Sequence, residues 1–143
     1  MLPDNTRLLI AACGAMVLLV LLVGVRLFVV RIGEMRTKRI HPQATANSLK
    51  VAERLQNVQA ADNFRNLFEV PVLFYALVAV ALAVGPVPGW LAVGAWLFVL
   101  LRYLHSAIHC SYNRVMHRFA VYGLSLAVLA ALWAAYLVKV LLA

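Results

Sequence analysis

The chain has 143 residues, of which 65% are hydrophobic and 13% charged, with 13 Lys and Arg against 5 Asp and Glu. A soluble domain is about 45–50% apolar and about 25% charged, so this composition excludes a soluble globular enzyme and a disordered tail. The net charge of +8 would suit a nucleic-acid-binding protein. The charges, however, lie in gaps between apolar runs, so lipid is the expected solvent and nucleic acid is not an expected partner.

Four apolar runs are long enough to cross a bilayer as helices, which takes about 20 residues each. The expected spans are residues 8–30, 67–84, 90–110 and 119–139, within a single membrane domain of residues 1–143. The first run is longer than the apolar part of a signal peptide and is followed by arginine, not by a cleavage site. Pro86 and Pro88 leave room only for a tight turn between the second and third spans. Because the runs are continuous and do not alternate, we expect an all-α bundle of four membrane helices.

The positions of the basic residues predict how the bundle is oriented. The link between the first two spans carries Arg31, Arg36, Lys38, Arg39, Lys50, Arg54 and Arg65. The link between the last two spans adds Arg114 and Arg118, whereas the link between spans two and three has no charge. Since basic links stay in the cytoplasm, both of these links are expected there, with both termini on the other side. The expected location is a bacterial inner membrane.

Polar side chains at membrane depth are functional candidates, and here they gather at the cytoplasmic ends of the spans. If the segment from residue 59 is helical, Gln59, Asn63 and Asn66 share one face. Arg102, His105 and His109 share a face of the third span in the same way. The candidates for one polar pocket open to the cytoplasm are Arg26, Gln59, Asp62, Asn63, Asn66, Glu69, Arg102, His105, His109, Asn113, Arg114, His117, Arg118 and Tyr122.

Simpler interpretations exist for the same residues. Basic residues near span ends often only set topology, and Glu69 could serve only to pair with Arg65 or Arg102 and neutralise a buried charge. Asn63 and Asn66 could hold helices together by hydrogen bonds. His105 and His109 have the i,i+4 spacing of a metal site, but two histidines are too few, so no metal is expected.

The order of these features resembles the MAPEG superfamily, the membrane-associated proteins of eicosanoid and glutathione metabolism, in a bacterial-type member. Residues 60–71, Ala-Ala-Asp-Asn-Phe-Arg-Asn through Pro71, resemble the family's Ala-x-x-Asn-x-x-Glu segment. Arg102-Tyr-Leu-His105 resembles its Arg-x-x-His element. Arg36-Thr-Lys-Arg39, followed by Pro42, resembles the family's end of the first span.

The resemblance implies a homotrimer that binds glutathione between neighbouring subunits near the cytoplasmic face, while a lipophilic electrophile enters from the lipid. It implies a transferase or peroxidase in which Arg114 supports the glutathione thiolate and Arg36 lies near the reacting atoms. Positive charge favours a thiolate, which is the reactive form of the thiol. The remaining contacts to the tripeptide are expected from Gln59, Asn63, Asn66, Glu69, Arg102, His105 and Arg118.

Three positions depart from the family pattern. Gln59 stands where the family has arginine, Asn66 where it has glutamate, and His109 where it has tyrosine. Amides form hydrogen bonds but cannot balance a carboxylate or an ammonium group. The alternative function is therefore a non-catalytic trimeric membrane protein that binds a lipid or another anion, or an accessory subunit of a membrane complex. The sequence leaves open whether the protein is an enzyme.

Overall fold

The computed structural model describes residues 2–142. The expected domain of residues 1–143 also includes Met1 and Ala143, which lie outside the described residues. The described chain is all-helical, and its elements are α1 (Asp4–Thr37), the short 3₁₀ helix η1 (Pro42–Thr45), α2 (Ser48–Arg54), α3 (Gln59–Asn66), α4 (Val70–Val84), α5 (Gly89–Cys110) and α6 (Val115–Leu141). Within residues 2–142, four segments are long and apolar enough to cross a membrane: α1, α3 with α4, α5, and α6.

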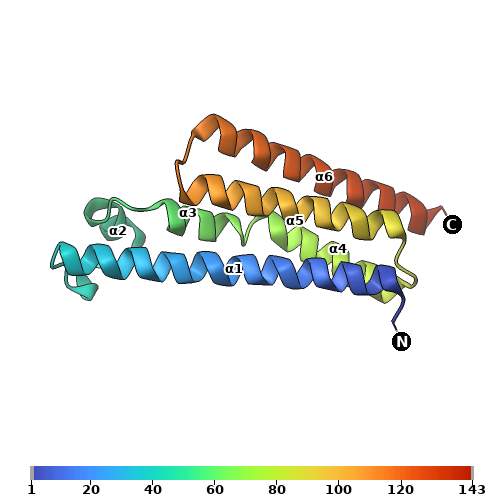
Figure 1. Ribbon diagram of the computed structural model, residues 1–143, viewed down its shortest axis with the longest axis horizontal. Coiled ribbons are helices and arrows are strands. Elements are labelled where there is room, and N and C mark those ends of the chain that lie inside the picture. The colour runs from blue at the N-terminus through green and yellow to red at the C-terminus, as the bar shows by residue number, and fades with distance from the viewer. Residues whose placement is uncertain (1, 143) are drawn as a thin grey trace.

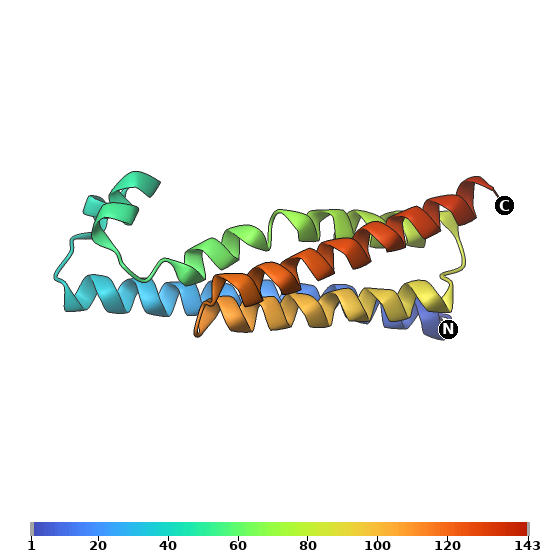
Figure 2. The same ribbon diagram turned by 90° about the horizontal axis from the view of Figure 1, so that it is seen from above.

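The long helices run along a common direction (Figure 1). α5 packs against α1 on one side and α6 on the other, and α6 runs at an angle to α5 (Figure 2). Both chain ends and the α4–α5 turn lie at one end of the bundle. The α5–α6 link and the segment with η1 and α2 lie toward the other end. This arrangement brings the two basic links to the same end, as the sequence predicts.

The helix is interrupted between α3 and α4, because proline has no N–H to continue a helix and fits best in the first turn of a new one. Pro71 occupies that first turn, and α4 begins at Val70. With 15 residues, α4 is about 22 Å long, which is shorter than the bilayer core of about 30 Å. α3 therefore completes the crossing, and its polar residues are brought to membrane depth.

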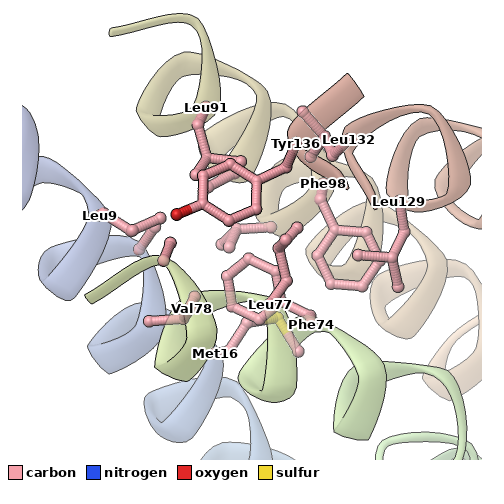
Figure 3. Close-up of a cluster of buried hydrophobic side chains, with 14 of the residues drawn as sticks. Leu9, Met16, Phe74, Leu77, Val78, Leu91, Phe98, Leu129, Leu132 and Tyr136 are labelled. Carbon is pink, nitrogen blue, oxygen red and sulfur yellow. The ribbon is translucent and has the colours of Figure 1, made fainter. Parts of the chain in front are cut away.

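The apolar core is contributed by all four long helices (Figure 3). The rings of Phe74 on α4 and Phe98 on α5 stack with centres 4.9 Å apart, and Figure 3 shows Tyr136 of α6 directed toward Leu9 of α1. In lipid such contacts stabilise by close packing, since burial from lipid gains little hydrophobic free energy. α5 and α6 pack closely at Gly94, because a Cβ at this position would collide with the side chain of Leu132 on α6.

Two hydrogen bonds from side chains of α1 mark the two ends of the apolar part of the bundle. Near one end, Asn5 Nδ2 donates to the carbonyl of Val87 at 3.3 Å; near the other, Arg26 donates to the carbonyl of Cys110, where α5 ends. Residues 5 and 26 are 21 residues apart, or about 32 Å of helix, which matches a bilayer core of about 30 Å. α1 continues to Thr37, so its last eleven residues extend about 16 Å beyond the level of Arg26.

Glu34, on this extension of α1, anchors the segment that leads to α3. Its buried carboxylate accepts from Lys38 Nζ at 2.6 Å, from the backbone N–H groups of Gln56 and Asn57 at 2.7 and 3.1 Å, and from Asn57 Nδ2 at 3.3 Å. The hydrogen bond from the Gln56 N–H, followed by the one from Lys38, lowers the pKa of Glu34 from 4.5 to about 2. The carboxylate therefore stays charged and fixes the position at which the chain enters α3.

Candidate functional site

α5 presents a buried polar face toward its carboxyl end. Arg102, His105, Ser106 and His109 are each no more than 3% exposed. Their spacing of three and four residues places them on one side of the helix, as the sequence predicts for Arg102, His105 and His109. Buried polar side chains are costly in lipid unless they are paired, so the partners of this face indicate its role.

Arg102 is fully buried and only partly satisfied. Its Nη2 donates to the carbonyl of Asn66 at 3.0 Å, and its guanidinium carbon lies 5.4 Å from the ring centre of Tyr122, within the range of a cation–π contact. Among the described residues, Nε and Nη1 have no hydrogen-bond partner. A buried donor without an acceptor costs about 1–3 kcal/mol, and more when it is charged, so this guanidinium is suited to receive an acceptor from outside the chain.

Arg118, on α6, connects to both histidines. Its Nη1 lies 2.7 Å from His109 Nε2 and donates to Asn113 Oδ1 at 3.0 Å. Its carbonyl lies 3.2 Å from His105 Nδ1. Since arginine is only a donor and a carbonyl only an acceptor, His109 accepts at Nε2 and His105 donates from Nδ1.

These hydrogen bonds determine which ring nitrogen of each histidine remains without a partner. In neutral rings His109 keeps a proton on Nδ1, and His105 keeps a lone pair on Nε2. Both atoms are buried, and neither has a partner in the described part of the chain. Among the buried atoms of this face in the described chain, three donors, Arg102 Nε, Arg102 Nη1 and His109 Nδ1, and one acceptor, His105 Nε2, are unused. A ligand rich in acceptors, such as a carboxylate or a phosphate, complements this set.

Asn63 has a different environment. It is fully buried on α3, accepts from Ser106 Oγ at 3.3 Å and donates to Cys110 Sγ at 3.4 Å. Its amide is therefore occupied in joining α3 to α5, which is the helix-joining role that asparagine has in membrane bundles.

Two small hollows open onto this face of the bundle. One, of about 250 Å³, is lined by Asp62, Arg65, Asn66, Glu69, His109 and Arg118. The other, of about 210 Å³, is lined by Asn66, His105, Val115, Arg118, Phe119 and Tyr122. Asn66 and Arg118 line both, so the hollows are neighbours. We call Asn66, Arg102, His105, His109, Arg118 and Tyr122 the polar site.

The structure brings together five of the residues that the sequence marks as contacts. Asn66, Glu69, His105 and Arg118 line the hollows. Arg102 lines neither hollow but lies behind them, bonded to the carbonyl of Asn66. Gln59 begins α3 and lines neither hollow. Arg114 immediately precedes α6, is exposed and also lines neither. Arg36 lies ten residues, or about 15 Å, along α1 from the level of Arg26, beside a separate hollow of about 490 Å³. Within one chain, Arg36 and the polar site are therefore far apart.

His109 and Tyr122 belong to the polar site but are not among the contacts predicted for glutathione. The sequence pattern that indicates both residues is helical spacing, because His109 follows His105 by four residues and Tyr122 follows Arg118 by four. Among residues 2–142, no group of three or more His, Cys, Asp or Glu side chains is placed to hold a metal ion.

Four apolar helices with a buried, donor-rich site at one end define an integral membrane protein with a pocket suited to an acceptor-rich ligand. The sequence model of the MAPEG family matches residues 9–138, nearly the whole chain, and the protein belongs to the MAPEG family. This match confirms the resemblance seen in the residue pattern. No individual curated protein and no solved structure gives a significant match.

Proposed function

We propose that the protein is a glutathione-dependent transferase or peroxidase that acts on lipophilic electrophiles. In this proposal it is a homotrimer in the bacterial inner membrane, with the polar site facing the cytoplasm. The observation that carries the proposal is the fully buried Arg102 guanidinium, which has two N–H groups without a partner among the described residues. Glutathione carries two carboxylates, and charge-assisted hydrogen bonds from arginine to carboxylate are among the strongest in proteins.

The donors of the site fit such a ligand. Arg102 Nε and Nη1 and His109 Nδ1 would receive a carboxylate of the tripeptide. Arg118 lines both hollows and would place positive charge beside the thiol, which favours the thiolate. We assign this role to Arg118 rather than to Arg114, because Arg114 lies outside both hollows. Arg36 would approach the reacting atoms only from a neighbouring subunit.

The reaction needs a proton acceptor and an electrophile. The unused lone pair of His105 Nε2 is available to take the thiol proton. The thiolate sulfur then forms a bond to an electrophilic carbon, and the leaving group departs with the electrons of the bond that breaks. In peroxide reduction, two glutathione molecules are oxidised to the disulfide while a lipid hydroperoxide is reduced to the alcohol and water. The co-substrate would arrive through the lipid, which suits its apolar character.

A second candidate function is a non-catalytic protein that binds a lipid anion in the same pocket. Asn66 favours it, because this uncharged side chain lines both hollows at the position where the family has glutamate. The ammonium group of glutathione would then have to be balanced by Glu69 or Asp62, which line only one of the two hollows, and Asp62 already pairs with Arg65 at 3.6 Å.

Titration calorimetry of glutathione into the detergent-solubilised protein tests the proposal. We expect binding that weakens about tenfold or more in Arg118→Ala, the loss of one charge-assisted contact of about 1.5–3 kcal/mol. Arg114→Ala removes the same charge outside both hollows and should change the affinity less than about twofold. No binding at millimolar glutathione, together with a lipid anion that copurifies and is lost in Arg118→Ala, would establish the second function instead.

A further inference from the structure

A larger hollow, of about 560 Å³, lies between the end of α1, the segment of η1 and α2, and α3. Its lining includes Arg31, Thr45, Asn47, Leu49, Asp62 and Arg65. Asp62 and Arg65 also line the hollow of about 250 Å³ in the polar site, so these two side chains of α3 stand between the two spaces. The volume of the larger hollow is in the range of pockets that hold small ligands, about 300–1,000 Å³.

The depth of this hollow matches the lipid headgroup layer. The apolar part of the bundle ends near Arg26, which contacts the last residue of α5. Arg31 is five residues further, or about 7.5 Å along the axis of α1. The headgroup layer adds about 5–8 Å on each side of the hydrocarbon core. Arg31 thus lies at the level where lipid phosphates lie.

The chemistry of the lining is that of an amphiphile site. Among the described residues that line it, two arginines stand against one carboxylate, and Arg65 pairs with that carboxylate, Asp62, at 3.6 Å. Thr45 and Asn47 add polar groups, and Leu49, which is 75% exposed, adds an apolar rim. Arginine binds phosphate through several parallel hydrogen bonds.

The surface next to the hollow continues into the membrane. Phe28 precedes Arg31 by three residues, so it lies on the same face of α1, one turn closer to the bilayer centre. Its side chain is 68% exposed. A molecule with its anionic head at Arg31 would therefore have an apolar path for its chain along Phe28.

We propose that this hollow binds the headgroup phosphate of an anionic phospholipid, held mainly by Arg31, with one acyl chain along Phe28. The charge of the lining and its depth select a lipid phosphate over a soluble one. The proposal does not depend on glutathione chemistry, because Arg31, Thr45 and Asn47 line neither hollow of the polar site.

Native mass spectrometry of the purified full chain, titrated with phosphatidylglycerol or phosphatidylcholine in detergent, tests it. We expect phosphatidylglycerol to bind about tenfold more tightly than phosphatidylcholine, and Arg31→Ala to remove this preference. Lys50→Ala is the matched control, because Lys50 is an exposed basic residue of the same link that does not line the hollow; it should keep the preference. Arg31→Lys should retain part of it, and unchanged circular dichroism verifies that each variant folds.

Three results would overturn the proposal. The first is equal affinity for the two lipids, and the second is an equal effect of Arg31→Ala and Lys50→Ala. The third is competition by glycerol phosphate at concentrations equal to those of the lipid, which would show that the hollow binds a free phosphate. Glutathione titration of Arg31→Ala separates the two sites, since its affinity should be unchanged if the polar site is intact.

Discussion

Replacing Arg102 with methionine separates a ligand-binding arginine from a structural one. Methionine has a similar length and fills irregular space well, so the change removes mainly charge and hydrogen bonding. The fold loses the bond to the Asn66 carbonyl, about 1.5–3 kcal/mol for a charged donor, and the contact with Tyr122, about 0.5–2 kcal/mol. It gains by removing two buried donors without described partners, at about 1–3 kcal/mol each. The two sides nearly cancel, so the change in unfolding free energy should be within about 2 kcal/mol of zero.

Anion binding should respond differently to Arg102→Met. A bound carboxylate would lose its charge-assisted bonds to this guanidinium, which at about 1.5–3 kcal/mol each corresponds to at least about a tenfold weaker Kd. Thermal unfolding in detergent and glutathione titration on the same preparation measure both quantities. A loss of more than about 4 kcal/mol of stability, the typical result of breaking a buried ion pair, would show that Arg102 is structural and refute this reasoning.

Two further predictions concern the fold. Glu34→Gln should speed hydrogen exchange at the Gln56 and Asn57 amides by about tenfold, because charged acceptors bind more strongly than neutral ones. In the native protein the folded pKa of Glu34, about 2, lies below its ordinary value of 4.5. The carboxylate therefore stabilises the link fully above about pH 4.5 and loses this effect as the pH falls toward 2; a pH series of exchange corrected for intrinsic rates should show this, and protection that is constant down to about pH 2 would contradict it. Gly94→Val should lower the thermal unfolding temperature by overpacking against Leu132, at about 1–3 kcal/mol, whereas Gly14→Val, which meets nothing within 4 Å, is the control and should lower it less.

The four apolar helices could be predicted from the sequence, because a bilayer requires long apolar runs and little else has that composition. The true ends of the helices could not. The apolar run of the first span ends at residue 30, but α1 continues to Thr37, since polar residues outside the membrane can remain helical. The start of α4 at Val70 depends on Pro71, which the sequence displays, but the separate helix α3 before it depends on packing against α1 and α5.

The polar face of α5 could also be predicted, because helical spacing alone places Arg102 and His105 together. The roles of the remaining arginines could not. Arg26, Arg114 and Arg118 all lie near the same membrane surface, yet only Arg118 enters the polar site. Arg26 instead donates to the end of α5. Which arginine turns inward is decided by the geometry of the α5–α6 link, where Asn113 has a positive φ of 48° and accepts from Arg118.

The extension of α1 beyond the bundle has a kinetic consequence. It carries, with the segment that follows it, the basic residues Arg31, Arg36, Lys38, Arg39, Lys50 and Arg54. A soluble anion approaching from that side meets this positive field before it reaches Arg102, so its association rate should exceed that of an uncharged analogue and fall with ionic strength. The screening length is about 8 Å at physiological salt, half of the roughly 16 Å by which α1 extends, so the charges nearest the bilayer contribute most. A lipophilic molecule that diffuses in from the membrane avoids this field, and its arrival should not depend on salt.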